Sequence, residues 1–544
     1  MKFELKVIMF SRLNTVSKSI TGAAYLIASA TLLSRVVGLI RDRTFAHYYT
    51  AGPVMDAYFA AFKIPDLVYN LLIIGALSAG FIPTFTKLLM TKDDKADAWK
   101  LANNVLNIAA ISLFVIAIIG IILTPWLAPI IAPGFEGERR DLVIAFTRIM
   151  FASPLLMGIS MVLGGILQSL RQFLLYSIAP IFYNLGIIFG VVILVPAFGI
   201  TGIAWGVVLG ALLHSALQFY GAYASGYRWK WIINLRNPET RLIGKLMAPR
   251  TLGIAVTQLN TVVVTILASL LPIGSVAVYN YANNLQGVPV GIIGISFALA
   301  VFPVLSAAAG KNDKIDFIKN ISATLRQVLF LIIPSSIVVI LLRAQIVRVV
   351  LGTGQFDWTA TIHTADALAL FGLSLFAQSL IPLFARAFYA LSNTKTPFVI
   401  GVIAELISII AALLLMKPYG VAGLALASSI GAIINFALLA ITLRQLAGPM
   451  EEQKLLTLLY KLSVAAIVMA LVTQFLKTPL AKIVDMERFW GILSQGLISG
   501  TMGLLVYGVI CWLLKVEEIL LLHASLKKRW MKIWNVQESI GYDK

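Results

Sequence analysis

Long apolar stretches without charge alternate with short polar segments along the whole chain of 544 residues. The stretches are about 20 residues long, the length at which an α-helix crosses the hydrocarbon core of a bilayer. They do not alternate as ten-residue barrel strands would, so their backbone groups must pair within helices. The pattern predicts fourteen membrane-spanning helices, near residues 20–40, 55–83, 101–125, 142–168, 173–195, 200–224, 247–271, 277–305, 321–342, 365–389, 397–416, 419–443, 457–476 and 490–514.

The composition supports an all-α polytopic membrane protein. Hydrophobic residues make up 59% of the chain and charged residues only 12%, whereas about a quarter of a soluble domain is charged. A single cysteine, Cys511, excludes an internal disulfide and a cysteine-based metal cluster, and the four histidines lack ligand spacing. We therefore expect no metal and no cofactor.

Basic residues are distributed unevenly between the two sides of the predicted membrane. With the N-terminus inside, 29 of the 43 Lys and Arg lie in cytoplasmic segments, 10 in outer segments and four within spans. Cytoplasmic loops of membrane proteins carry the excess of Lys and Arg. Both termini are thus predicted to be cytoplasmic, and the first 19 residues, which lack a small-residue cleavage signal, are predicted to be a retained leader.

Six spans recur as a second copy of six. Residues 195–211 (VPAFGITGIAWGVVLGA) match 417–432 (KPYGVAGLALASSIGA) at an offset of 221. A similar offset aligns Pro83 with Pro303 and residues 167–172 with 388–393. Because six is even, the copies are predicted to share one orientation, as in transporters built from parallel repeats.

The repeat and the charge pattern predict six segments. They are a cytoplasmic leader (1–19), an N-lobe of spans one to six (20–225), a cytoplasmic linker (226–250), a C-lobe of spans seven to twelve (251–443), two extra spans (444–515) and a basic cytoplasmic tail (516–544). A phosphate-binding loop is absent, since neither Gly-Lys pair has a Gly five residues earlier. Paired repeats without a catalytic domain favour a transporter over an enzyme.

Charged residues cluster in the first two spans. A charge deep in a bilayer costs several kcal/mol unless it faces water or a partner, so such residues are candidates for function. Pro65, Gly75, Gly80 and Pro83 would also bend the second span beside a cavity. We interpret Arg35, Arg41 and Lys63 as phosphate ligands lining a central cavity, oriented by Asp42 and Asp56.

The alternative is that some of these charges have no role in binding. Arg41, Asp42 and Arg43 could reach the outer interface, and Lys63 could pair with Asp66 three residues later. For Arg43 we favour this interpretation, whereas Arg35 and Lys63 lie too deep to reach the interface easily.

The corresponding part of the second copy carries neutral amides. They are Asn280, Asn283, Asn284 and Gln286, and Lys63 aligns with Asn283 at an offset of 220. Amides can bind sugars or peptide groups, or simply tie helices together. Arg148, Asp366, Arg386 and Glu405 are further charges in or near spans that could serve a coupling cation or proton, and the membrane potential alone is another possible driving force.

Five stretches of the chain resemble the MurJ/MviN family, the lipid II flippases of the multidrug/oligosaccharidyl-lipid/polysaccharide exporter superfamily. They are LSRVVGLIRD (33–42), DAYFAAFKIPDL (56–67), GALSAGFIP (75–83), YANNLQGVPVGIIGISF (281–297) and FYALSNTKTP (388–397). The resemblance implies two lobes around a central cavity. It also implies that undecaprenyl-diphosphate-linked peptidoglycan precursor moves from the inner to the outer leaflet of a bacterial inner membrane by alternating access.

The resemblance places cavity residues at Ser34, Arg35, Arg41, Asp42, Asp56 and Lys63. It implies a role in cell-wall biogenesis and cell shape, with membrane lipids and cell-wall synthesis proteins as partners and no nucleic acid. One departure is that Asn283 and Asn284 stand where the family often has an Asp-Arg pair. This would leave more of the diphosphate to the basic residues of the first two spans.

Four other functions would fit some of these features. A flippase for another prenyl-linked oligosaccharide would need the same cationic residues, whereas a cation-coupled drug antiporter of the superfamily should have an acidic cavity. A glycosyltransferase using prenyl-linked donors would need carboxylates and a metal site in a sizeable extramembrane domain, and none is visible. A scaffold for cell-wall enzymes should tolerate loss of Arg35 and Lys63.

Overall fold

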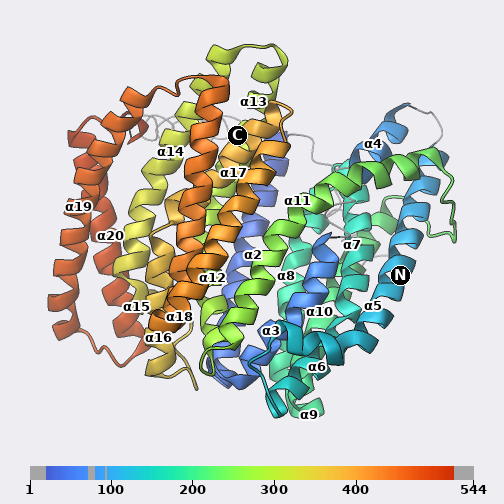
Figure 1. The fold of residues 1–544 in the computed structure, drawn as a ribbon, viewed down its shortest axis with the longest axis horizontal. Coiled ribbons are helices and arrows are strands. Elements are labelled where there is room, and N and C mark those ends of the chain that lie inside the picture. Colours follow the sequence, from blue (N-terminus) through green and yellow to red (C-terminus); the bar gives the residue numbers. More distant parts are fainter. Residues whose placement is uncertain (1–19, 72–79, 92–94, 520–544) are drawn as a thin grey trace, which may run out of the picture. The chain divides into compact units, whose positions relative to one another are not determined.

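The computed structural model describes residues 20–71, 80–91 and 95–519, and every regular element in these ranges is a helix (Figure 1). The predicted leader and most of the tail lie outside them, as does Gly75. The α-helices are α2 (Ile20–Tyr49), α3 (Pro53–Tyr69), α4 (Ile82–Thr91), α5 (Ala96–Ile131), α6 (Glu138–Met150), α7 (Ala152–Ser169), α8 (Phe173–Phe189), α9 (Val195–Phe198), α10 (Gly202–Ala224), α11 (Pro238–Ser269), α12 (Ser275–Pro289), α13 (Ser296–Gly310), α14 (Lys314–Leu341), α15 (Arg343–Val350), α16 (Trp358–Gly372), α17 (Leu375–Ala390), α18 (Lys395–Ala447), α19 (Glu452–Ile483) and α20 (Phe489–Leu513).

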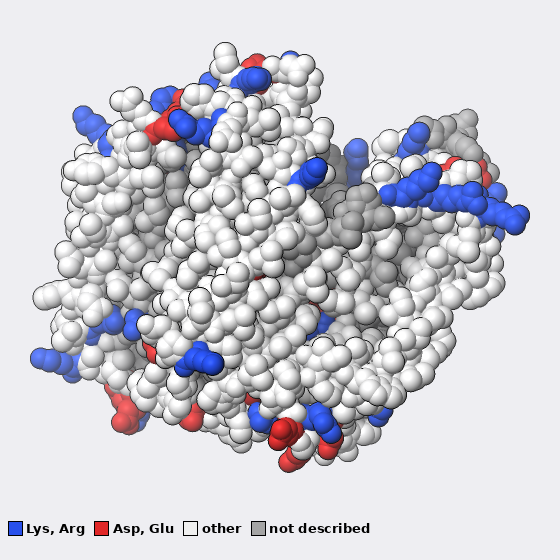
Figure 2. Space-filling view, in the orientation of Figure 1, with Lys and Arg blue, Asp and Glu red and all other residues white. Residues whose placement is uncertain are grey.

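Each of the fourteen predicted spans is helical over its described residues, apart from short breaks and a residue or two at some ends. Within the described residues, eight helical stretches are long and apolar enough to cross a membrane, or nine if α16 and α17, which meet at 48°, form one span. On the face shown in Figure 2, charged side chains gather near helix ends and leave the sides of the helices almost uncharged. The prediction of an all-α polytopic membrane protein is confirmed.

Two of these stretches fold back on themselves. Phe173–Ala224 has 52 residues and Lys395–Ala447 has 53, which at 1.5 Å per residue is more than twice the thickness of the hydrocarbon core. A Cβ on Gly186 would lie 2.3 Å from the Cα of Gly210, and Ser408 Oγ donates to the carbonyl oxygen of Ala427 at 3.2 Å. The two halves of each stretch therefore pack together, and each stretch accounts for two spans.

The predicted repeat is visible in the backbone. The first hairpin turns at Gly199 (φ 69°) and the second at Gly420 (φ 56°), 221 positions apart and both in a conformation that favours glycine. Arg171 and Ser392, again 221 apart, both have φ 59° at a helix end. Both copies also carry a π-helical turn at equivalent positions, at residues 70–71 and at Val290–Ile295. These shared irregularities confirm the six-span repeat.

The chain divides into two compact units. The first contains residues 1–281, 350–360 and 416–421, and the second contains the remainder. In the first unit α4, α5 and α7 share a core with the start of α11, formed by Phe81, Phe85, Leu101, Leu163 and Ile243 among others. The finer segment boundaries given above remain predictions.

In the first unit, three buried asparagines of α5 hold the chain that follows α10. Asn103 donates to the carbonyl oxygen of Arg228 at 3.1 Å and accepts from the N–H of Lys230 at 2.7 Å. Asn107 donates to the carbonyl oxygens of Lys230 and Ile232, and Asn104 exchanges hydrogen bonds with the backbone of Asn234. Side-chain amides thus satisfy extended backbone that has no neighbouring strand.

Candidate substrate-binding site

Arg41 lies near the C-terminal end of α2 and is held by side chains from two helices. Its Nε and Nη2 donate to Asp42 Oδ1 at 3.0 and 2.8 Å, and its Nη1 donates to Asn184 Oδ1 of α8 at 3.0 Å. The Asp42 side chain is 4% exposed and that of Arg41 is 22% exposed. This partly buried ion pair fixes the guanidinium while leaving part of it open.

Lys63 lies on α3, nearly two turns before the end of that helix. It is partly buried, and its Nζ donates to Asn280 Oδ1 of α12 at 3.1 Å. Asn280 in turn donates to the carbonyl oxygen of Val276 at 2.7 Å, which fixes the orientation of its amide. A neutral amide positions the ammonium here without neutralising its charge.

Asp56, also on α3, binds backbone N–H groups. Its Oδ2 accepts from Gly274 at 2.6 Å and its Oδ1 from Ala277 at 2.9 Å, and the residue is 1% exposed. These N–H groups belong to the first turn of α12 and the residue before it, where the backbone donors of a helix lack partners inside the helix. Asp56 therefore caps α12, a role that the sequence analysis did not anticipate.

The remaining predicted site residues lie in different surroundings. Ser34 and Arg35 are partly exposed on α2, a turn and more before Arg41. Asn283 is exposed and accepts from Gln286 Nε2 at 2.9 Å, while Asn284 is partly exposed. Both asparagines belong to the second compact unit, whereas Ser34, Arg35, Arg41, Asp42, Asp56 and Lys63 belong to the first.

Arg43 faces a different part of the first unit. Its Nη1 donates to the carbonyl oxygen of Val350 at 3.3 Å. His47, one turn later on α2, contacts the same loop, since its carbonyl oxygen accepts from the N–H of Gln355 at 3.0 Å. These contacts agree with our preference for a structural role of Arg43.

The sequence did not reveal that Asn184 is the partner of Arg41 or that Asn280 is the partner of Lys63. Asn184 is an isolated amide in an apolar span, and this isolation is the one feature of the sequence that points to a partner within the membrane. Asn280 was noted, but only as part of the neutral second copy. Among the described residues, no three His, Cys, Asp or Glu side chains come together as metal ligands.

A family model for the lipid II flippase MurJ matches residues 45–491, which is most of the chain. The chain belongs to this family. The lipid II flippase MurJ of Burkholderia cenocepacia is 29% identical over 428 residues, covering 77% of this chain and 83% of that protein. The family resemblance found in the sequence is therefore confirmed.

Solved structures agree with this membership. A lipid II flippase MurJ in an inward closed conformation superposes with a TM-score of 0.74 at 25% identity, covering 89% of this chain and 98% of that one. An inward-facing multidrug resistance MATE family transporter of the MOP superfamily gives a TM-score of 0.65 at 15% identity, covering 78% and 98%. The second likeness shows that the MurJ fold is shared with MATE transporters.

Proposed function

We propose that this member of the MurJ family moves lipid II from the inner to the outer leaflet of the bacterial cytoplasmic membrane by alternating access, as a transporter without catalytic activity. The observation that carries the proposal is the family match over residues 45–491. The fold supports it, since the chain has paired six-span repeats of the kind that transporters use to expose one site to either side.

The basic residues of the first unit suit the diphosphate of such a cargo. Arg41 has five N–H donors, three of which are used by Asp42 and Asn184, so two remain for phosphate oxygens. Lys63 has three donors, and Asn280 takes one. Together the two side chains offer four donors and two positive charges, the combination that binds phosphate groups tightly.

The other predicted site residues would complete the contacts. Arg35 adds a third positive charge, and Ser34 a hydroxyl beside it on α2. Asn283 and Asn284 would bind sugar or peptide groups of the cargo, for which neutral amides suffice. A coupling cation or the membrane potential would drive the cycle, and both termini would lie in the cytoplasm.

Depletion of the protein in its own bacterium tests the proposal. Lipid II should accumulate, remain on the cytoplasmic leaflet and be inaccessible to a reagent added from outside. Expression of the native chain should restore the exposure of lipid II on the outer leaflet. Expression of a variant with Arg41→Ala and Lys63→Ala should not. Normal exposure of lipid II after depletion would refute the proposal.

A reconstituted assay separates the possible cargoes. Vesicles containing the purified protein should translocate lipid II faster than a prenyl-diphosphate lipid bearing an unrelated oligosaccharide. Preference for the second lipid would assign the chain to that cargo. Transport of cationic drugs without transport of either lipid would indicate a drug antiporter.

A further inference from the structure

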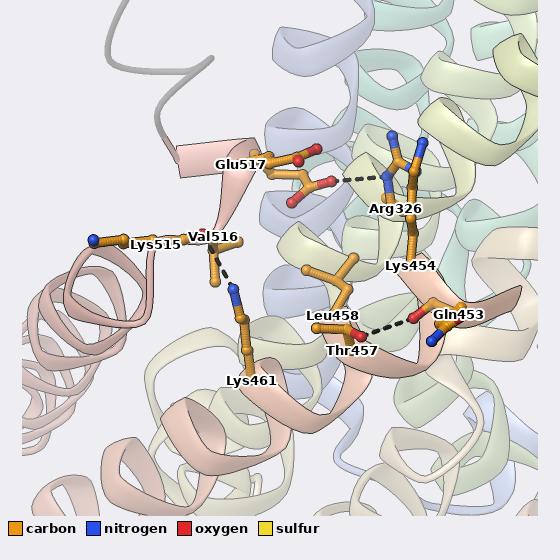
Figure 3. Close-up of a pocket in the computed structure, with 10 residues that line it drawn as sticks. Arg326, Gln453, Lys454, Thr457, Leu458, Lys461, Lys515, Val516 and Glu517 are labelled. Carbon is orange, nitrogen blue, oxygen red and sulfur yellow. Dashed lines mark hydrogen bonds and ion pairs between the residues drawn. The ribbon is translucent and has the colours of Figure 1, made fainter. Parts of the chain in front are cut away.

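A small charged cavity lies in the second unit, apart from the residues assigned to the cargo. It has a volume of about 200 Å³ and is formed by α14, the first turns of α19 and the segment that follows α20 (Figure 3). Its lining residues are Arg326, Gln453, Lys454, Thr457, Leu458, Lys461, Lys515, Val516, Glu517 and Glu518. Because α14, α19 and α20 are all of membrane-spanning length, a cavity at the Glu452 end of α19 lies near a membrane surface.

One wall of the cavity is a fixed ion-pair network. Arg326 Nε donates to Glu518 Oε1 at 3.1 Å, and Arg326 Nη1 donates to Glu451 Oε2 at 3.0 Å. Glu451 also pairs with Lys454. Since these charges neutralise one another, they hold the segment after α20 against α14 and shape the cavity.

Two residues of opposite charge that line the cavity, Lys461 and Glu517, take no part in this network. Lys461 Nζ donates to the carbonyl oxygen of Lys515 at 3.3 Å, so two of its three N–H donors have no acceptor among the described residues. Glu517 is exposed and pairs with no cation in the described part of the chain. Figure 3 shows that the side chain of Lys515 extends away from the other lining residues, which leaves Lys461 and Glu517 as the available pair.

We propose that this cavity binds the headgroup of a phospholipid that carries both a phosphate and a primary ammonium, that is, a phosphoethanolamine group. Lys461 binds the phosphate and Glu517 the ammonium, so the charges of the ligand and the cavity complement each other. Drug-sized ligands occupy pockets of roughly 300–1,000 Å³, so this cavity suits a headgroup rather than the sugars and peptide of the cargo.

The surroundings of the cavity suit the rest of such a lipid. Tyr460, 71% exposed, and Trp512, 61% exposed, lie next to lining segments, and aromatic residues of this kind favour the level of lipid headgroups. Further along α19 the exposed side chains of Ile467, Leu471 and Phe475 offer an apolar surface for acyl chains. A lipid held at the cavity would thus lie along the two extra helices, α19 and α20.

Native mass spectrometry of the purified, delipidated full-length protein tests the proposal. Phosphatidylethanolamine, phosphatidylglycerol and phosphatidylcholine with the same acyl chains are each titrated in the absence of lipid II. Phosphatidylethanolamine should saturate one site with at least about tenfold higher affinity than either other lipid, because it alone of the three has a cationic headgroup with N–H donors for Glu517. Equal, unsaturable binding of all three lipids would overturn the proposal.

Two variants and a matched control locate the site. Lys461→Gln keeps a donor for the Lys515 carbonyl but loses the charge, and should weaken binding of all three lipids about tenfold or more. Glu517→Gln should abolish only the preference for phosphatidylethanolamine. Lys482→Gln, at an exposed position near the other end of α19, should change nothing. If Lys461→Gln binds lipid like Lys482→Gln while unfolding at the native temperature, the site is not this cavity. Either outcome leaves the lipid II proposal untouched.

Discussion

The carboxylate of Asp56 in α3 accepts a hydrogen bond from the backbone N–H of Gly274, 218 positions later, at 2.6 Å. Together with its bond to Ala277, this contact joins the second span to the start of α12 through a single buried side chain. A capping carboxylate is worth about 0.5–2 kcal/mol, and each buried N–H left without an acceptor costs about 1–3 kcal/mol.

Asp56→Ala is therefore expected to lower the free energy of unfolding by about 2–4 kcal/mol. Thermal unfolding of the purified protein in detergent measures the effect as a lower Tm. Glu136→Ala removes an exposed carboxylate of the same unit and is the control, for which Tm should not change. An unchanged Tm for Asp56→Ala would mean that water or another group replaces the cap.

The open N–H donors of Arg41 predict a defect in cargo binding. Arg41→Lys keeps the positive charge but loses the forked geometry, so lipid II should bind roughly tenfold more weakly, and Arg41→Ala should bind still less. Arg43→Gln is the matched control two residues away, because Arg43 donates to the Val350 carbonyl, and it should bind lipid II almost normally. Equal losses in the Arg41 and Arg43 variants would show that both act through folding.

The hairpin turns at Gly199 and Gly420 predict a specific intolerance of alanine. Their backbone conformations cost a residue with a Cβ about 1–3 kcal/mol, although a Cβ at either position would meet no other atom within 4 Å. Gly199→Ala and Gly420→Ala should each lower Tm. Gly401→Ala, inside α18 and equally unobstructed, should raise Tm slightly or leave it unchanged because alanine favours helix. The same response at all three positions would contradict the backbone argument.

The buried phenol of Tyr227 should make the folded protein less stable at alkaline pH. Burial raises the pKa of its phenol to about 12, and the phenol donates to Asn103 Oδ1 at 2.8 Å. Because the folded pKa lies above the unfolded value of about 10, its contribution is complete below pH 10 and is lost as the pH rises from about 10 to 12. Tyr227→Phe should lower Tm at pH 8 by removing the hydrogen bond and should flatten the fall in Tm between pH 9 and 11. Parallel curves for the two proteins would show that Tyr227 does not titrate in this range.

Hydropathy predicted the positions of the helices well because a chain in lipid has few other ways to satisfy its backbone. The turns at Gly199 and Gly420 could also be predicted, because both glycines lie at matching positions of the repeated sequence. The breaks between α6 and α7 and between α16 and α17 were not, because the apolar pattern runs through both with little change.

The candidate site could be predicted only in part. The sequence singled out Arg41, Asp42 and Lys63 as candidates because charges are rare and costly in such spans. It could not identify Asn184 as the partner of Arg41, or the capping role of Asp56, because these contacts join residues 143 and 218 positions apart. Pairings of that kind depend on tertiary packing, which periodicity along one helix does not determine.

The π-helical turns at residues 70–71 and Val290–Ile295 bear on how the protein arose. A π turn is in effect a helix that has gained one residue. A single insertion before the gene duplication would account for both turns, and the ancestral six-span chain would then already have carried this bend.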